Sequence, residues 1–220
     1  MPIRRFVRTW LSPQDRLAEA ICGIVMVLSV TAYTRAAMEE PSSTAFLVAI
    51  LGCNAAWGLV DGGTYVFGSI QTRGRRLMIR RSLSGATGPV QVERHAREVI
   101  EESLGEWLPE GERRDRAVAW AMEVARSAPP EKPGVRKEDL LAGLACFCLM
   151  FFGTLPLAAP YLLLRDLGRA ILVSQGVAVL LLFLLGRQWG TLSGFRPIRA
   201  GLLFTIIGLA LSGVTQFLGG

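Results

Sequence analysis

Five long apolar stretches impose the strongest limit on what this chain can fold into. They cover residues 17–34, 45–70, 140–164, 170–186 and 200–220. A helix of about 20 such residues spans the hydrocarbon core of a bilayer, because each helical residue adds about 1.5 Å to its length. Inside these stretches only Glu19 and Asp61 carry a charge. We therefore predict an all-α polytopic membrane protein with five transmembrane helices, held in the lipid bilayer.

Two charged segments lie before and between the predicted spans. Residues 1–16 alternate arginines with aromatic and apolar residues, a pattern typical of a short segment on the membrane surface. Residues 71–139 contain 14 basic and 12 acidic residues, and helical periodicity recurs over 90–108 and 112–127. We expect a helical domain here, inserted between the second and third spans. Its helices are expected to pack against each other, the membrane helices or a second subunit.

The basic residues beside the spans predict how the chain is oriented. With five spans, fourteen of these arginines and lysines fall on one side of the membrane. The other side has three, Arg35, Arg165 and Arg169. Basic residues are retained on the cytoplasmic side, so the N-terminus and residues 71–139 are predicted to be cytoplasmic and the C-terminus external. We expect the cytoplasmic (inner) membrane of a bacterium. The net charge of +6 is explained by this orientation and does not require a nucleic-acid partner.

Asp61 is the first candidate functional residue, because a carboxylate deep in a membrane span is costly unless it is partnered, hydrated or protonated. On a helix, Asn54, Thr64 and Tyr65 share its face. Met26 on the first span can add a thioether. Oxygen ligands with a thioether suit Fe²⁺ or Mn²⁺ better than Mg²⁺ or Ca²⁺. The pattern predicts a transport site for a divalent metal ion or a proton relay, with no resident cofactor.

Asp61 also has a structural alternative. It can form an interhelical hydrogen bond or ion pair, or cap a break in the helix at Gly62-Gly63. Gly58 and Gly62 are four residues apart, a small-residue spacing that lets a neighbouring helix approach closely. The sequence leaves the transport and structural readings of Asp61 open.

A weaker cytoplasmic candidate is the segment HAREVIEE. His95, Glu98 and Glu102 lie on one helical face and can collect metal near the mouth of a membrane path. The alternative is a solvated helix face on which Arg94 and Arg97 balance the acids. Charged surface helices are common, so this alternative is favoured.

The order of these pieces resembles the vacuolar iron transporter family. The similar stretches are FFGTLPLAAPYLLL (151–164) and LLFLLGRQWGTLSGFRPIRAGLLFTIIGLALSGVTQFLGG (181–220). They match the proline-rich third span of that family and the Arg-containing approach to its last span. The resemblance implies five spans, a charged helical insert after the second, a homodimer, and H⁺-coupled export of Fe²⁺ or Mn²⁺ from the cytoplasm.

The chain departs from that family at its acidic transport residues. Its first span has CGIVMVLS (22–29) where the family usually has Asn-Asp-Gly, and Thr64 stands where the second span usually has Glu. Asp61 and Met26 are therefore proposed on chemistry and location alone. The alternative function is a non-transporting membrane scaffold or sensor that acts through the cytoplasmic helical domain. A membrane enzyme ranks third, because no paired catalytic groups and no nucleotide, nucleophile-elbow or metalloprotease motif occur.

Overall fold

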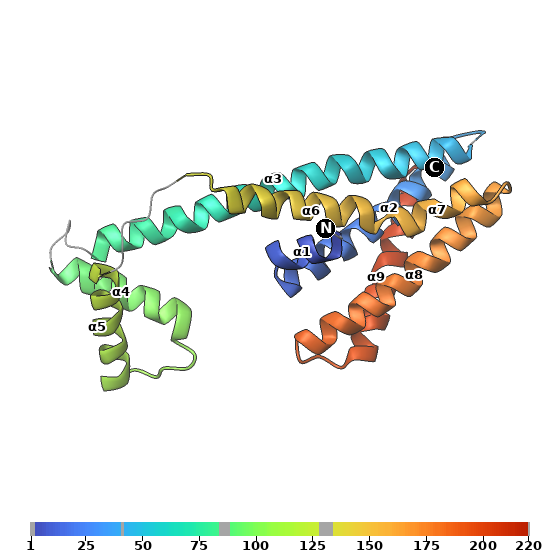
Figure 1. Cartoon of the computed structure of the whole chain (residues 1–220). Helices are drawn as coiled ribbons and strands as arrows, with labels where there is room; N and C mark the ends of the chain where they lie inside the picture. Colours follow the sequence, from blue (N-terminus) through green and yellow to red (C-terminus); the bar gives the residue numbers. More distant parts are fainter. Residues whose placement is uncertain (1–2, 41, 84–88, 128–133, 220) are drawn as a thin grey trace. The chain divides into compact units, whose positions relative to one another are not determined.

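The computed structural model describes residues 3–40, 42–83, 89–127 and 134–219, and these residues form helices and no strand. The chain divides into two compact units, Met1–Val66 with Arg136–Gly220, and Phe67–Val135. The described elements, labelled in Figure 1, are α1 (Ile3–Trp10), α2 (Pro13–Ala37), α3 (Ser43–Leu83), α4 (Pro89–Leu104), α5 (Glu112–Ser127), α6 (Lys137–Gly153), α7 (Leu155–Leu163), α8 (Leu167–Leu192) and α9 (Pro197–Gly219).

Five helical segments are long and apolar enough to cross a membrane, which confirms the predicted number of spans. They are Pro13–Ala37, Ser43–Met78, Lys137–Leu163, Leu167–Leu192 and Pro197–Thr215. The second is longer than expected, because α3 continues to Leu83 without interruption. The third consists of α6 and α7, which meet at Thr154. Pro156 explains this break, since proline has no N–H and its ring clashes with the carbonyl four residues earlier.

Polar side chains determine where several helices begin. The Ser12 hydroxyl accepts the Asp15 N–H at 3.1 Å, while the Asp15 carboxylate accepts the Ser12 N–H at 3.3 Å. This reciprocal capping box, followed by Pro13, separates α1 from α2. Asp166 caps α8 in the simpler way, by accepting the Arg169 N–H at 2.8 Å.

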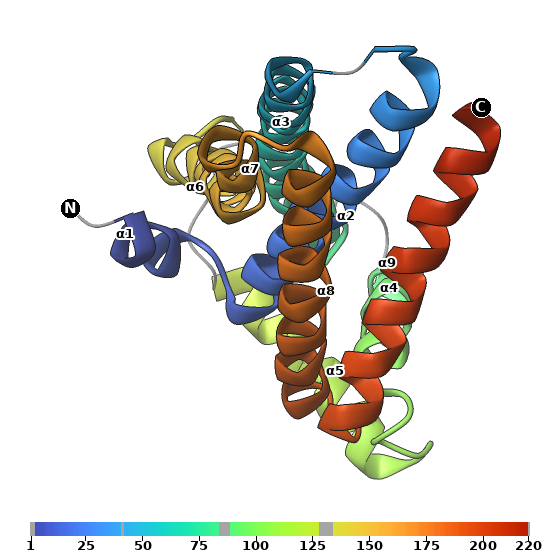
Figure 2. The same ribbon diagram turned by 90° about the vertical axis from the view of Figure 1, so that its right-hand side faces the viewer.

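Close helix crossings assemble the membrane-spanning unit. Its main core joins α2, α3, α7 and α8, and includes the stacked rings of Phe46 and Tyr161. The α8 and α9 helices pack together near the turn that joins them and diverge toward the C-terminus (Figure 2). Gly186 and Gly201 let their backbones approach. The turn between them uses Gly194 at φ +68°, the left-handed conformation that ends many helices.

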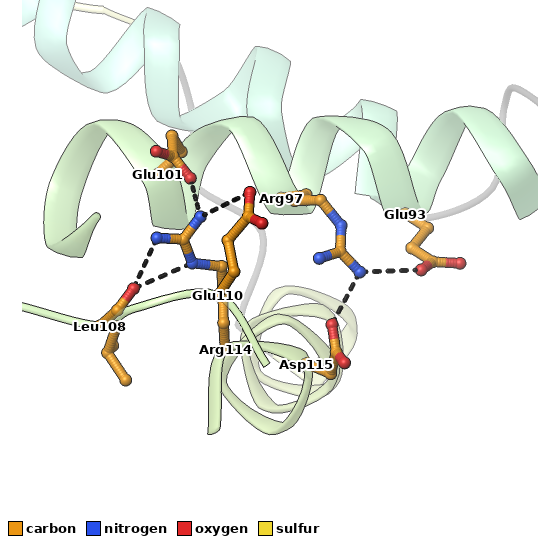
Figure 3. A network of polar contacts seen from close by, with 7 residues as sticks. All are labelled: Glu93, Arg97, Glu101, Leu108, Glu110, Arg114 and Asp115. Atoms are coloured by element: carbon orange, nitrogen blue, oxygen red, sulfur yellow. Dashed lines mark hydrogen bonds and ion pairs between the residues drawn. The ribbon is translucent and has the colours of Figure 1, made fainter. Parts of the chain in front are cut away.

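The second unit contains two helices that pack against each other as a hairpin, which is one of the three arrangements expected for them. Ala96, Ile100 and Val118 are buried between α4 and α5. Figure 3 shows two arginines that link these helices. Arg97 pairs with Asp115 at 2.8 Å, and this hydrogen bond raises the pKa of Arg97. Arg114 is buried, pairs with Glu101 and donates two hydrogen bonds to the Leu108 carbonyl, so it closes the loop between the helices.

Candidate functional site

Asp61 on α3 faces a second acid, Glu19 on α2. The two carboxyl groups are close enough to interact electrostatically, and the Cys146 thiol on α6 lies near Glu19. Asp15, one turn earlier on α2, adds another negative charge nearby. Three membrane-spanning helices therefore contribute to one acidic site.

Small residues bring these three helices together. Gly62, the neighbour of Asp61, packs so closely on α6 that an added Cβ would lie 2.6 Å from the Gly143 carbonyl oxygen. One turn along α6 from Gly143 comes Cys146, which is fully buried. The α2 helix also packs on α6, where a Cβ on Gly23 would lie 3.4 Å from the Met150 sulfur. The small-residue spacing of Gly58 and Gly62 thus does bring a neighbouring helix close, as expected.

The negative charges of Glu19 and Asp61 can be neutralised by a cation. The Oε2 atom of Glu19 is buried and has no hydrogen-bond partner. Two like charges about 4 Å apart repel by about 4 kcal/mol at an effective dielectric constant of 20. Ionised carboxylate oxygens can only accept hydrogen bonds, so two of them cannot bond to each other. A proton or a metal ion between the carboxylates supplies the missing positive charge and removes this repulsion. The site is chemically suited to hold either one.

Other buried oxygens in the same unit also lack hydrogen-bond partners. The Asn54 amide donates to the Ile50 carbonyl of its own helix at 3.0 Å, while its Oδ1 is buried and unpaired. The Tyr161 hydroxyl lies near the hydroxyls of Thr31 and Ser174 without forming a well-aligned bond. The Asn54 amide therefore donates a hydrogen bond to its own helix, and its Oδ1 atom can still accept one.

The other membrane candidates lie in different surroundings. Met26 is half-buried two turns after Glu19, which puts both on one face of α2. Thr64 is exposed, and its hydroxyl donates to the Val60 carbonyl at 2.8 Å. Tyr65 is half-buried and packs on the cluster formed by α1 and α6.

The candidates on α4 do not form a described cluster. The His95 side chain lies outside the described residues. Glu98 is exposed, and Glu102 forms an exposed ion pair with Arg75. Arg97 pairs with Glu93 and Asp115, in keeping with the alternative of a charge-balanced surface helix.

Within the described part of the chain, no three His, Cys, Asp or Glu side chains are placed to hold one metal ion. A metal at the Glu19–Asp61 pair would need further donors, such as a thioether, a carbonyl, water or a second subunit. Sequence reasoning did not select Glu19, because its position near the start of the span suggested a hydrated residue. Its spacing of seven residues from Met26 was the available signal.

A comparison with protein families gives one match, in which the model described as VIT family covers residues 95–220. The match covers more than half of the 220 residues and includes both stretches that resembled the vacuolar iron transporters. It does not extend to α2 and α3, which carry Glu19 and Asp61. No curated protein matches the chain.

Proposed function

Because the chain belongs to the VIT family, we propose that it carries divalent metal ions, Fe²⁺ or Mn²⁺, across a membrane and exchanges them for protons at Glu19 and Asp61. The observation that carries this proposal is the facing pair of carboxyl groups from two different spans, with one buried oxygen left unpaired. Ionisable groups inside membrane spans commonly mark ion paths and proton relays.

The charge of the pair suits this exchange. Two ionised carboxylates carry the charge that one divalent cation neutralises, and two protons neutralise it equally well. Loading the metal on one side releases two protons, and two protons restore the neutral pair after the metal leaves. The site is then without net charge in both states, which lowers the cost of keeping it in the membrane.

Sulfur near the pair supports a transition metal as cargo. The Cys146 thiol lies beside Glu19, and Met26 shares the Glu19 face of α2. Sulfur ligands discriminate against Mg²⁺ and Ca²⁺, which prefer oxygen. We further propose that a homodimer supplies the missing donors and that the α4–α5 hairpin lies in the cytoplasm.

The test measures metal uptake and proton movement in proteoliposomes that contain the full chain. We expect Glu19→Gln and Asp61→Asn each to reduce Fe²⁺ and Mn²⁺ flux by about tenfold or more, in the range found when groups around metal sites are removed. The double variant should lose no more metal flux than either single variant, because the two carboxyl groups act as a unit. Glu39→Gln, which neutralises an exposed acid outside the pair, is the matched control. Wild-type flux in both single variants would refute the role of the pair.

The second candidate, a scaffold or sensor, has one observation in its favour. The described residues of a single chain do not provide three metal-ligating side chains in one place. If the wild-type protein moves neither metal nor protons, and neutralising the pair only raises its thermal stability, this candidate is preferred over transport.

A further inference from the structure

A cavity of about 570 Å³ lies between α1 and the membrane spans. Three arginines line it, Arg4 and Arg8 from α1 and Arg16 from α2. Its apolar lining includes Leu149, Phe152 and Leu185 from α6 and α8. Clustered guanidinium groups and apolar side chains therefore border the same space.

The three arginines have no carboxylate partner among the described residues. None of their guanidinium groups forms an ion pair or a hydrogen bond there. The nearby carboxylate of Asp15 is engaged by the Ser12 cap. A second hollow, of about 370 Å³, is bordered by Arg4, Arg8 and the adjacent Arg5. This end of the unit thus concentrates guanidinium groups that no described side chain engages in an ion pair.

The arginines of α1 are held by packing on the protein. Val7 and Leu11 are buried against Ala142, Ala145 and Cys146 of α6, and Figure 2 shows α1 beside α6. Positions four apart on a helix share a face. Arg4 and Arg8 therefore share one face of α1. The buried Val7 lies beside them and also lines the cavity, so it holds this face against the protein.

We propose that this cavity binds one anionic phospholipid, with its phosphate among Arg4, Arg8 and Arg16 and its acyl chains against Leu149, Phe152 and Leu185. Guanidinium groups bind phosphate oxygens in a bidentate manner, which gives this charge cluster its specificity. The apolar wall argues for a lipid over a free phosphate, which has no apolar part to bury. Basic pockets between membrane helices are known to recognise anionic headgroups.

Native mass spectrometry of the full-length protein in detergent tests this proposal with phosphatidylglycerol and phosphatidylcholine as probes. We expect one bound phosphatidylglycerol per chain and much weaker retention of phosphatidylcholine. The triple variant Arg4→Gln, Arg8→Gln, Arg16→Gln should bind phosphatidylglycerol about 100-fold more weakly, because each arginine near an anionic lipid contributes about fivefold. The matched control replaces three exposed arginines outside the cavity, Arg76, Arg113 and Arg196, by glutamine and should bind as the wild type does.

A variant that fills the cavity without changing its charge separates lipid binding from simple electrostatics. Gly153 lines the cavity, and a Cβ there meets no atom within 4 Å. Gly153→Leu should therefore keep the fold, checked by circular dichroism, and reduce phosphatidylglycerol binding. Equal binding by the wild type and the triple variant would overturn the proposal. So would equal retention of the two lipids, or displacement of phosphatidylglycerol by millimolar inorganic phosphate, which would indicate a site for free anions.

Discussion

Gly62→Ala tests how the acidic pair is positioned, because this residue adjoins Asp61 where α3 crosses α6. An added Cβ would lie 2.6 Å from the Gly143 carbonyl oxygen and 3.2 Å from its carbonyl carbon. Both atoms belong to the backbone, so no side chain can rotate away. The two helices must separate until the Cβ reaches ordinary contact distance, about 3.4 Å or more.

The size of the effect follows from that separation. Over-packing at a close contact typically costs about 1–3 kcal/mol, since surrounding side chains lose dispersion contacts when the backbones move apart. At about 1.4 kcal/mol per factor of ten, the folding equilibrium constant falls by about five- to 150-fold. The same movement carries Asp61 away from Glu19, so metal flux should fall together with stability.

The assay is unfolding of the full chain in detergent, followed by circular dichroism, with flux measured in proteoliposomes. Gly63→Ala is the matched control, because a Cβ on this adjacent residue meets nothing within 4 Å. It should leave stability unchanged or raise it slightly, since alanine favours helix over glycine by up to about 1 kcal/mol. If Gly62→Ala proves as stable and as active as Gly63→Ala, the proposed crossing does not position the site.

Two further predictions concern the ends of the helices. Arg114→Ala should destabilise the α4–α5 hairpin by about 1.5–3 kcal/mol, because it leaves the Leu108 carbonyl without its guanidinium donor. Faster amide hydrogen exchange in this hairpin of the full chain measures the effect, and Arg116→Ala, at an exposed ion pair, should change exchange little. Ser12→Ala should cost about 1 kcal/mol by removing the cap on the Asp15 N–H. An unchanged unfolding midpoint for this variant would contradict the capping role.

The sequence predicted most of the helices because local composition determines them. Long uncharged runs must form helices in a bilayer, since each backbone group needs a partner within its own segment. The helices of the hairpin followed from apolar spacing. Pro156 marks the interruption of the third span, while α7 continues through Pro160. Charged residues that also favour a helix continue α3 to Leu83, and they carry no signal of where the membrane ends.

The sequence predicted one acid of the candidate site, Asp61, but not its partner, Glu19. The cost of a lone carboxylate in lipid singled out Asp61, but its partner could not be deduced from spacing along one helix. Glu19 lies 42 positions earlier in the chain. The two acids meet because glycines let both α3 and α2 approach α6 closely.

The sequence alone therefore determined that the chain spans a membrane five times and where its charges concentrate, since both follow from the cost of burying each residue in lipid. The tertiary structure decided which side chains face one another. That choice depends on contacts between backbones that are distant in sequence, and neither hydropathy nor helical periodicity records those contacts.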